Sequence, residues 1–287
     1  MVHAVGPLPP RRSGALGVVY GAKMYIFGGY DGRDGNYFND LFYFNFETRG
    51  WHELPSRNGT RPEARTDHIM TLFDHSMYIF GGYDGHNRYQ NMYKYDLKKN
   101  TGWELIAATG DLPSPRFGHS ASVHVASKQL LLFGGWDGKE TLNDLYSFSF
   151  TTKIWKKITT TGASPPHRYR HTSVVFNDSI FVFGGVDKQH CRYNDLQRLD
   201  IRSNVWSQVA TTGYVPSSRT FHRAAVVGNL MYLLGGYDGA ERLHDLYSVH
   251  VGTLTPATLL QSCSTYIRHN YKKMTKTAPL DGIPNGT

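Results

Sequence analysis

The sequence predicts an all-β fold built from one repeated four-stranded unit, a β-propeller. A glycine doublet recurs every 50 to 53 residues, and a tryptophan follows each of the first four doublets after 21 to 23 residues. Self-similarity at a fixed period of this length is the signature of a repeat architecture. The doublets begin at Gly28, Gly81, Gly134, Gly184 and Gly235, and the tryptophans are Trp51, Trp103, Trp155 and Trp206.

Each repeat contains signals for four strands. A short apolar run, such as MYIF or IFVF, ends at the glycine doublet and indicates a buried strand. An Asp-Gly turn and a second run, such as NDLFYF or NDLYSF, come next. The tryptophan marks a third strand, and a Pro-rich turn with an arginine, such as PSPRFGH, opens a further strand. Four strands per period are typical of a propeller blade.

The doublet, the tryptophan about 22 residues later and the period near 50 together resemble the Kelch repeat, from Arg12 to about Val251. The resemblance implies a Kelch-type β-propeller with five four-stranded repeats over residues 1–252, followed by a tail over residues 253–287. Bulky residues before the doublets should fill the space between stacked blades, namely Phe27, Phe80, Phe133 and Phe183. Kelch propellers usually have six or seven blades, so both a closed five-blade ring and an incomplete six-blade ring stay open.

The fifth repeat is irregular. It has no tryptophan near Ala257, where one is due, and no sign of a last strand. The opening MVHAVGPLPPR is similar to the end of a repeat. We therefore expect an N-terminal strand at Val2 to Gly6 to pair with the fifth blade and join the two ends of the chain, which would leave fewer exposed strand edges.

One arginine recurs at the head of each innermost strand, which predicts a ring of arginines around one mouth. Kelch proteins that bind peptides use these positions and the aromatic residue after the doublet. A guanidinium stays charged and offers paired donors to a carboxylate, so an acidic or C-terminal peptide is the expected ligand. The alternative is that each arginine caps a turn and bonds to carbonyls of the adjacent blade. The predicted binding residues are Arg12, Arg65, Arg116, Arg168, Arg219, Tyr30, Tyr83, Trp136 and Tyr237.

Four histidines recur three residues after the arginine, at His68, His119, His171 and His222. No Asp, Glu or Cys recurs beside them at ligand spacing, so we expect them to pack between blades and predict no metal site. The sequence also contains no nucleophile elbow, phosphate loop or HExxH helix. We expect no catalytic residues and no cofactor. A metal-dependent or sugar-binding propeller is the weakest of three hypotheses, because a fold does not dictate function.

The tail predicts a short amphipathic α-helix from Leu254, with Thr255 as N-cap. Its residues Thr258, Leu259, Cys263 and Ile267 resemble the elongin-binding box of cullin ubiquitin-ligase receptors. This resemblance implies an elongin/cullin ligase core as partner and makes substrate recognition the leading hypothesis, with Leu259, Cys263 and Ile267 on the docking face. The rival hypothesis is a scaffold or adaptor in signalling or cytoskeletal organisation, with the tail as a lid.

The composition narrows the choice of partners. The formal net charge is +8, but the basic residues are spread through the repeats, which favours an anionic protein segment over nucleic acid. No apolar run approaches the length of a membrane span, and the N-terminus does not resemble a secretory signal. The two cysteines suit a reducing compartment, so we expect a cytoplasmic protein that is also compatible with the nucleus.

Overall fold

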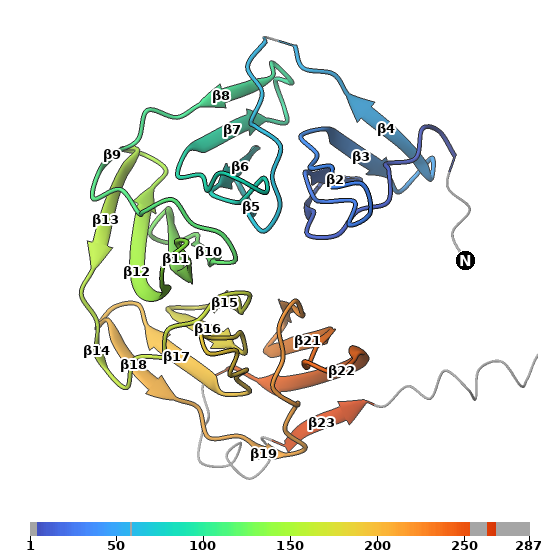
Figure 1. Cartoon of the computed structure of the whole chain (residues 1–287). Helices are drawn as coiled ribbons and strands as arrows, with labels where there is room; N and C mark the ends of the chain where they lie inside the picture. The colour runs from blue at the N-terminus through green and yellow to red at the C-terminus, as the bar shows by residue number, and fades with distance from the viewer. Residues whose placement is uncertain (1–4, 58, 253–262, 268–287) are drawn as a thin grey trace, which may run out of the picture.

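The computed structural model describes residues 5–57, 59–252 and 263–267. It confirms an all-β propeller of five blades arranged around a central axis (Figure 1). The innermost strands of the blades are β1, β5, β10, β15 and β20, and the three strands that follow each of them in the chain lie successively farther out. The described residues include no helix that is long and apolar enough to cross a membrane.

The first two blades contain four antiparallel strands each. The first consists of β1 (Leu16–Tyr20), β2 (Lys23–Phe27), β3 (Leu41–Asn45) and β4 (Gly50–Leu54). The second consists of β5 (Ile69–Phe73), β6 (Ser76–Phe80), β7 (Met92–Asp96) and β8 (Trp103–Leu105).

The other three blades carry a fifth, two-residue strand at the outer edge. The third consists of β9 (Thr109–Gly110), β10 (Ser120–His124), β11 (Gln129–Trp136), β12 (Thr141–Ser149) and β13 (Ile154–Ile158). The fourth consists of β14 (Thr161–Gly162), β15 (Thr172–Phe176), β16 (Ser179–Phe183), β17 (Leu196–Asp200) and β18 (Val205–Gln208). The fifth consists of β19 (Thr212–Gly213), β20 (Arg223–Val227), β21 (Leu230–Tyr237), β22 (Arg242–His250) and β23 (Cys263–Ile267).

The second strand of an interior blade is buried on both faces. All five residues of β6 and all five of β16 are buried, although successive side chains point to opposite sides of a sheet. The phenylalanine before each of the first three doublets packs against the repeat tryptophan of the next blade, with ring centroids 5.0 to 5.2 Å apart. These pairs are Phe27 with Trp103, Phe80 with Trp155, and Phe133 with Trp206. The predicted packing between blades is therefore confirmed.

The N-terminal segment does not join the fifth blade where it is described. Val5 forms a parallel bridge with Gly50, at the outer edge of the first blade. This bridge matches the way β9, β14 and β19 pair in parallel with the outermost strand of the blade that follows each of them. The expected pairing with the fifth blade is thus wrong at Val5, because each linker pairs with the blade it leads into. Met1–Ala4 lie outside the described residues.

The fifth blade has a fourth strand, contrary to the sequence-based expectation. Residues Cys263–Ile267 form β23, which runs antiparallel to β22 with Tyr247 opposite Tyr266. The predicted helix is therefore wrong over these five residues, and Leu259 lies outside the described part of the chain. The physical reason is that the free edge of β22 offers backbone donors and acceptors, which a fourth strand satisfies and a helix would not.

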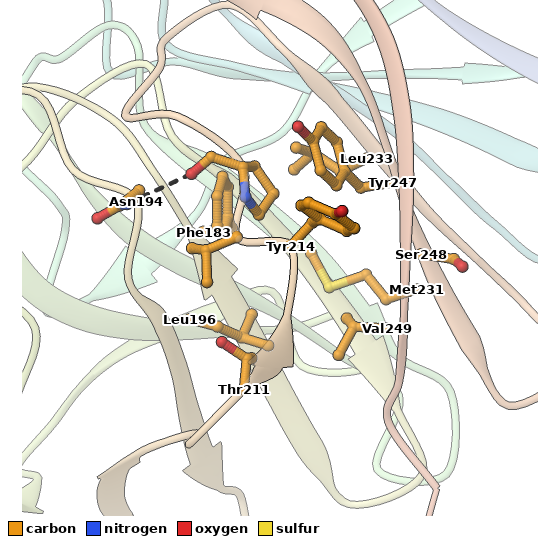
Figure 2. Close-up of a pocket in the computed structure, with 12 residues that line it drawn as sticks. Phe183, Asn194, Leu196, Thr211, Tyr214, Met231, Leu233, Tyr247, Ser248 and Val249 are labelled. Carbon is orange, nitrogen blue, oxygen red and sulfur yellow. Dashed lines mark hydrogen bonds between the residues drawn. The ribbon is translucent and has the colours of Figure 1, made fainter. Parts of the chain in front are cut away.

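The pairing of the outermost strands shows which residue of the fifth blade stands at the tryptophan position. Gly110 and Gly162 pair with Trp155 and Trp206, whereas the matching Gly213 pairs with Ser264. An apolar cavity of about 40 Å³ lies between the fourth and fifth blades near this position (Figure 2). Its size allows a few water molecules rather than a ligand. Its lining includes Phe183, Leu196, Tyr214, Met231, Leu233, Tyr247 and Val249.

The ring is open. Innermost strands of successive blades contact one another from β1 through β5, β10 and β15 to β20, but β20 makes no comparable contact with β1. Figure 1 shows the opening between the first blade, in blue, and the fifth, in orange and red. We call this opening the seam. The innermost strands of the described blades thus do not close into a ring.

Replacing Trp155 by alanine should lower the free energy of unfolding by about 3–5 kcal/mol, because its fully buried ring packs against Phe80 of the preceding blade. The same change at Trp51, which is only half-buried at the seam, should cost clearly less. Urea unfolding followed by circular dichroism measures both variants. Equal losses would contradict the assignment of the seam as an unfilled interface.

A candidate protein-interaction face

Two kinds of loop meet at one end of the propeller. The loop with the Asp-Gly turn, between the second and third strands of a blade, bridges to the segment that opens the innermost strand of the same blade. We call this end the loop face. The bridges are Ser13 with Tyr30, Thr66 with Tyr83, Phe117 with Trp136, Tyr169 with Val186, and Thr220 with Tyr237.

The repeat arginines lie beneath this face, where they form ion pairs within their own blades. Nη1 of Arg168 donates to the carbonyl of Gly184 at 2.9 Å, and Nη1 and Nη2 donate to the two carboxylate oxygens of Asp195 at 2.7 and 2.8 Å. Three further blades repeat this paired contact, namely Arg12 with Asp40, Arg116 with Asp144, and Arg219 with Asp245. The aspartate is the second residue of the NDL or HDL motif.

The second blade reaches the same result with other residues. Asn91 stands where the other blades have the aspartate, and its side-chain oxygen accepts a bond of 3.0 Å from Nη1 of Arg65. The missing charge is supplied by Glu63, whose carboxylate pairs with Nη2 of Arg65. The substitution therefore leaves the buried guanidinium neutralised.

This placement corrects the sequence-based assignment of the arginines. Arg65, Arg116, Arg168 and Arg219 are 0–1 % exposed, and Arg12 is largely covered, so none of them forms an open ring around a mouth. Burial alone would raise the pKa of Asp195, but the hydrogen bonds and charge of Arg168 outweigh it and hold that pKa below its ordinary value. The arginines thus join two loops of one blade, as the structural alternative expected in part, but the carbonyls they bond belong to their own blade and not to the adjacent one.

The recurring histidines pack between blades. His68, His119, His171 and His222 lie edge-on to the phenylalanine of the preceding blade, with ring centroids 5.4 to 5.7 Å apart. Burial first, and the nearby repeat arginine second, lower the pKa of His68 and of His222 to about 3. The predicted packing role is therefore confirmed. Within the described residues no three His, Cys, Asp or Glu side chains come together in a metal-binding group.

A central channel of about 900 Å³ opens behind the loop face. The second residue after each repeat arginine has a left-handed backbone, with φ from 52° to 67°, and lines this channel. These five residues are Gly14, Asp67, Gly118, Arg170 and Phe221. Nε and Nη2 of Arg170 both donate to Oδ2 of Asp67 at 3.0 Å, so an ion pair bridges the second and fourth blades across the axis.

Six aromatic rings form a continuous arc across the loop face, which we call the aromatic arc. Neighbouring ring centroids are 4.8 to 6.2 Å apart, a spacing typical of interacting aromatic pairs. The arc runs through Tyr30, Tyr37, Tyr83, Phe117, Tyr169 and Trp136. It brings together three of the four predicted aromatics, whereas Tyr237 lies apart, under Arg192.

Two arginines of the loop face lie on aromatic rings without an acidic partner among the described residues. The guanidinium of Arg88 is 5.4 Å from the Tyr83 ring and 5.9 Å from the Phe117 ring. That of Arg192 is 5.2 Å from the ring of Tyr237. Nε of each makes no hydrogen bond. Both arginines are half-buried and occupy the same bridge position of their blades, opposite Tyr83 and Val186.

Sequence reasoning missed the residues that now define this face. Tyr37, Arg88 and Arg192 vary from blade to blade, so a search for recurring residues passes over them. Phe117 and Tyr169 directly follow a repeat arginine, and this position in the repeat could have predicted them. Each arginine is buried in its ion pair, while the side chain of Phe117 or Tyr169 next to it reaches the loop face.

Comparison with known proteins agrees with this architecture. The family model described as the KLHDC2/KLHL20/DRC7 Kelch-repeats domain matches residues 1–185 and 125–267. The chain belongs to the Kelch-repeat family. Kelch propellers of this kind serve as protein-interaction modules, and nothing among the matches or the described side chains points to a catalytic activity.

Three curated proteins illustrate the range of Kelch relatives. The leucine-zipper-like transcriptional regulator 1 homolog of Drosophila melanogaster is 34% identical over 271 residues, covering 89% of this chain and 27% of its own length. Human Kelch domain-containing protein 10 is 26% identical over 276 residues, covering 88% and 62%. Mouse Kelch domain-containing protein 1 is 28% identical over 300 residues, covering 92% and 72%. The chain thus spans between 27% and 72% of the length of these three relatives.

Replacing Arg168 by alanine should lower the free energy of unfolding by about 3–5 kcal/mol, because Asp195 is left as a largely buried, unpaired charge. Arg202→Ala is the matched control, since its pair with Asp178 is exposed and should contribute no more than about 1 kcal/mol. Chemical unfolding at neutral pH measures both. A small loss for Arg168→Ala would show that its burial is not structural.

Stability should fall as the pH drops from 6.5 toward 3, because the buried histidines stay neutral in the folded state and bind protons only after unfolding. One such histidine contributes up to about 1.4 kcal/mol per pH unit in this window. His68→Asn should remove that share of the slope, while the carboxylate contribution stays common to both proteins. Urea unfolding at pH 7, 6, 5 and 4 measures the difference, and parallel curves would contradict a neutral His68.

Proposed function

We propose that the loop face binds an acidic segment, or a C-terminal carboxylate, of a partner protein. The single observation that carries the proposal is that Arg88 and Arg192 lie on aromatic rings with no acidic partner among the described residues. A carboxylate from another chain is the group that would complete them.

The chemistry of the face supports this class of ligand. A guanidinium on an aromatic ring keeps its charge and its planar donor fork while the ring fixes its orientation. Aromatic side chains of the arc add contact area with few rotatable bonds, which lowers the entropy lost on binding. The net charge of +8 would speed the approach of an acidic partner at low ionic strength.

The proposal moves the ligand-binding role from the repeat arginines to a different set. The repeat arginines already pair with carboxylates of their own blades, so they have no net positive charge to offer. Arg170 is in an intermediate position, since its pair with Asp67 leaves its side chain 31% exposed. A carboxylate ligand would therefore contact Arg88 and Arg192 first, with Tyr83 and Tyr237 beneath them.

A role in substrate recognition for a ubiquitin ligase remains the more specific form of the hypothesis. In this form, the acidic partner protein is a substrate of the ligase. Its original support, a helix over the tail, no longer holds for Cys263 and Ile267, which are in β23. A scaffold or adaptor role uses the same loop face without a ligase core.

The proposed ligand class can be tested with a fluorescein-labelled hexapeptide of alternating aspartate and glutamate with a free C-terminus. Arg88→Gln together with Arg192→Gln should weaken binding by about tenfold or more, since each lost charge-assisted contact is worth about 1.5–3 kcal/mol. The control is Lys98→Gln with Lys99→Gln, in the exposed turn between β7 and β8 at the other end of the blade. Fluorescence anisotropy measures each affinity.

The outcome of this titration separates the possibilities. Equal loss with the lysine control variant would mean that net charge alone attracts the peptide, and the proposal would fail. An amidated peptide that binds as well as the free acid would assign the site to side-chain carboxylates. For the ligase hypothesis, capture of purified elongin B and C by the full chain would support it, and failure at micromolar concentrations would leave the scaffold role.

A further inference from the structure

Phe221 has an unusual backbone conformation for an aromatic residue. It is the second residue after Arg219, and its φ of 57° lies in the left-handed region, where a bulky side chain is disfavoured. Among the described non-glycine residues with positive φ, Phe221 alone has an apolar side chain. The first and third blades have Gly14 and Gly118 at this position. The fold itself therefore does not require an aromatic ring there.

Burial does not explain the ring either. Phe221 is 48% exposed and lines the central channel. Its ring centroid lies 4.3 Å from the guanidinium carbon of Arg170. A cation–π contact at an exposed site is a small gain beside the cost of a left-handed backbone. Backbone strain that the surrounding structure maintains is concentrated at ligand-binding sites, so the conformation of Phe221 suggests a role in binding.

Arg170 connects Phe221 to the aromatic arc. The guanidinium of Arg170 is 5.2 Å from the Tyr169 ring and 5.9 Å from the Phe117 ring, and both rings belong to the arc. The guanidinium of Arg88 is 5.9 Å from the same Phe117 ring. Phe221 therefore extends the proposed binding surface from Arg88 toward the fifth blade.

Arg170 also keeps one donor for a ligand. Its Nε and Nη2 both donate to Oδ2 of Asp67, whereas its Nη1 makes no hydrogen bond within the described part of the chain. The side chain of Arg170 is 31% exposed. A carboxylate of a ligand can therefore accept a hydrogen bond from Nη1. The residue next to that carboxylate would then lie within reach of the Phe221 ring.

An apolar side chain is the group that the Phe221 ring can bind. The ring has no hydrogen-bond donor or acceptor, and covering it removes apolar surface from water. A carboxylate over the ring would meet the negative face of the π-system and is disfavoured. The ring thus distinguishes an apolar side chain from an acidic one.

We propose that Phe221 is a specificity-determining residue, which receives an apolar side chain of the ligand beside a carboxylate held by Arg170. This inference rests on the proposed function. It narrows the ligand from a purely acidic segment to an acidic segment that contains an apolar residue.

The test compares two fluorescein-labelled hexapeptides of equal charge. Both follow the alternating aspartate and glutamate sequence, except that one central residue is leucine in the first peptide and glutamine in the second. The unmodified chain should bind the leucine peptide about five- to tenfold more tightly, because part of the leucine side chain leaves water. Phe221→Gly should reduce this preference to less than about twofold, and Phe221→Tyr, which keeps the ring, should retain it. Fluorescence anisotropy measures each affinity.

Thermal unfolding of a matched control separates binding from folding. Phe46, in the turn between β3 and β4, is also 48% exposed but has no positive φ. Phe221→Gly and Phe46→Gly remove similar apolar contact, and only the first relieves a left-handed backbone. The Phe221→Gly chain should therefore unfold about 2–4 °C above the Phe46→Gly chain. Phe46→Gly should leave the preference for the leucine peptide unchanged.

The outcomes separate this inference from the proposed function. If neither peptide binds, the proposed function fails and the apolar subsite fails with it. If both peptides bind equally well, or if Phe221→Gly weakens both to the same extent, the acidic site stands and the inference is overturned. An unfolding temperature of Phe221→Gly no higher than that of Phe46→Gly would show that the ring serves the fold, which also overturns the inference.

Discussion

The structure depends on the fact that each blade is apolar on both faces. A single four-stranded sheet cannot bury its two apolar faces, so every blade needs a neighbouring blade on either side. The phenylalanine before the glycine doublet and the histidine of the following blade meet this need at four interfaces, and a tryptophan of the following blade adds to three of them. The structure describes no blade beyond the fifth, and there Leu234 and Val227 are exposed. The packing of blade against blade thus explains the arrangement of the five blades and the exposed apolar side chains at the seam.

The buried arginines of this protein stabilise the blades, whereas the proposed ligand-binding site uses arginines at the surface. The repeat arginines are neutralised within their blades, and the second blade keeps this balance when Asn91 replaces the usual aspartate, because Glu63 supplies the charge. Such compensation indicates that an unpaired guanidinium is costly at this depth. Arg88 and Arg192 differ because they lie on rings at the loop face, where a ligand can reach them.

The seam and the loop face give the molecule two surfaces with different chemistry. The described walls of the seam carry the exposed apolar side chains of Val19, Val227 and Leu234. The loop face is aromatic and cationic, so it suits a carboxylate on a flexible segment. The two surfaces use different residues and can be altered separately, which allows one to be tested without disturbing the other.

The sequence by itself determined the repeat, because glycine doublets and tryptophans at a constant spacing fix the order and burial of the strands. It also determined the packing role of the histidines, since nothing beside them recurs as a metal ligand. It did not determine the environment of the arginines, because the carboxylate partners of four of the five are 26 to 28 residues away in the chain and become neighbours only when the blade folds. Tertiary structure alone decided that Cys263–Ile267 is a strand, since the free edge of β22 outweighs the local helical pattern. It also decided which side chains reach the loop face, since Phe117 and Tyr169 are partly exposed beside buried arginines, whereas Thr220 beside Arg219 is buried.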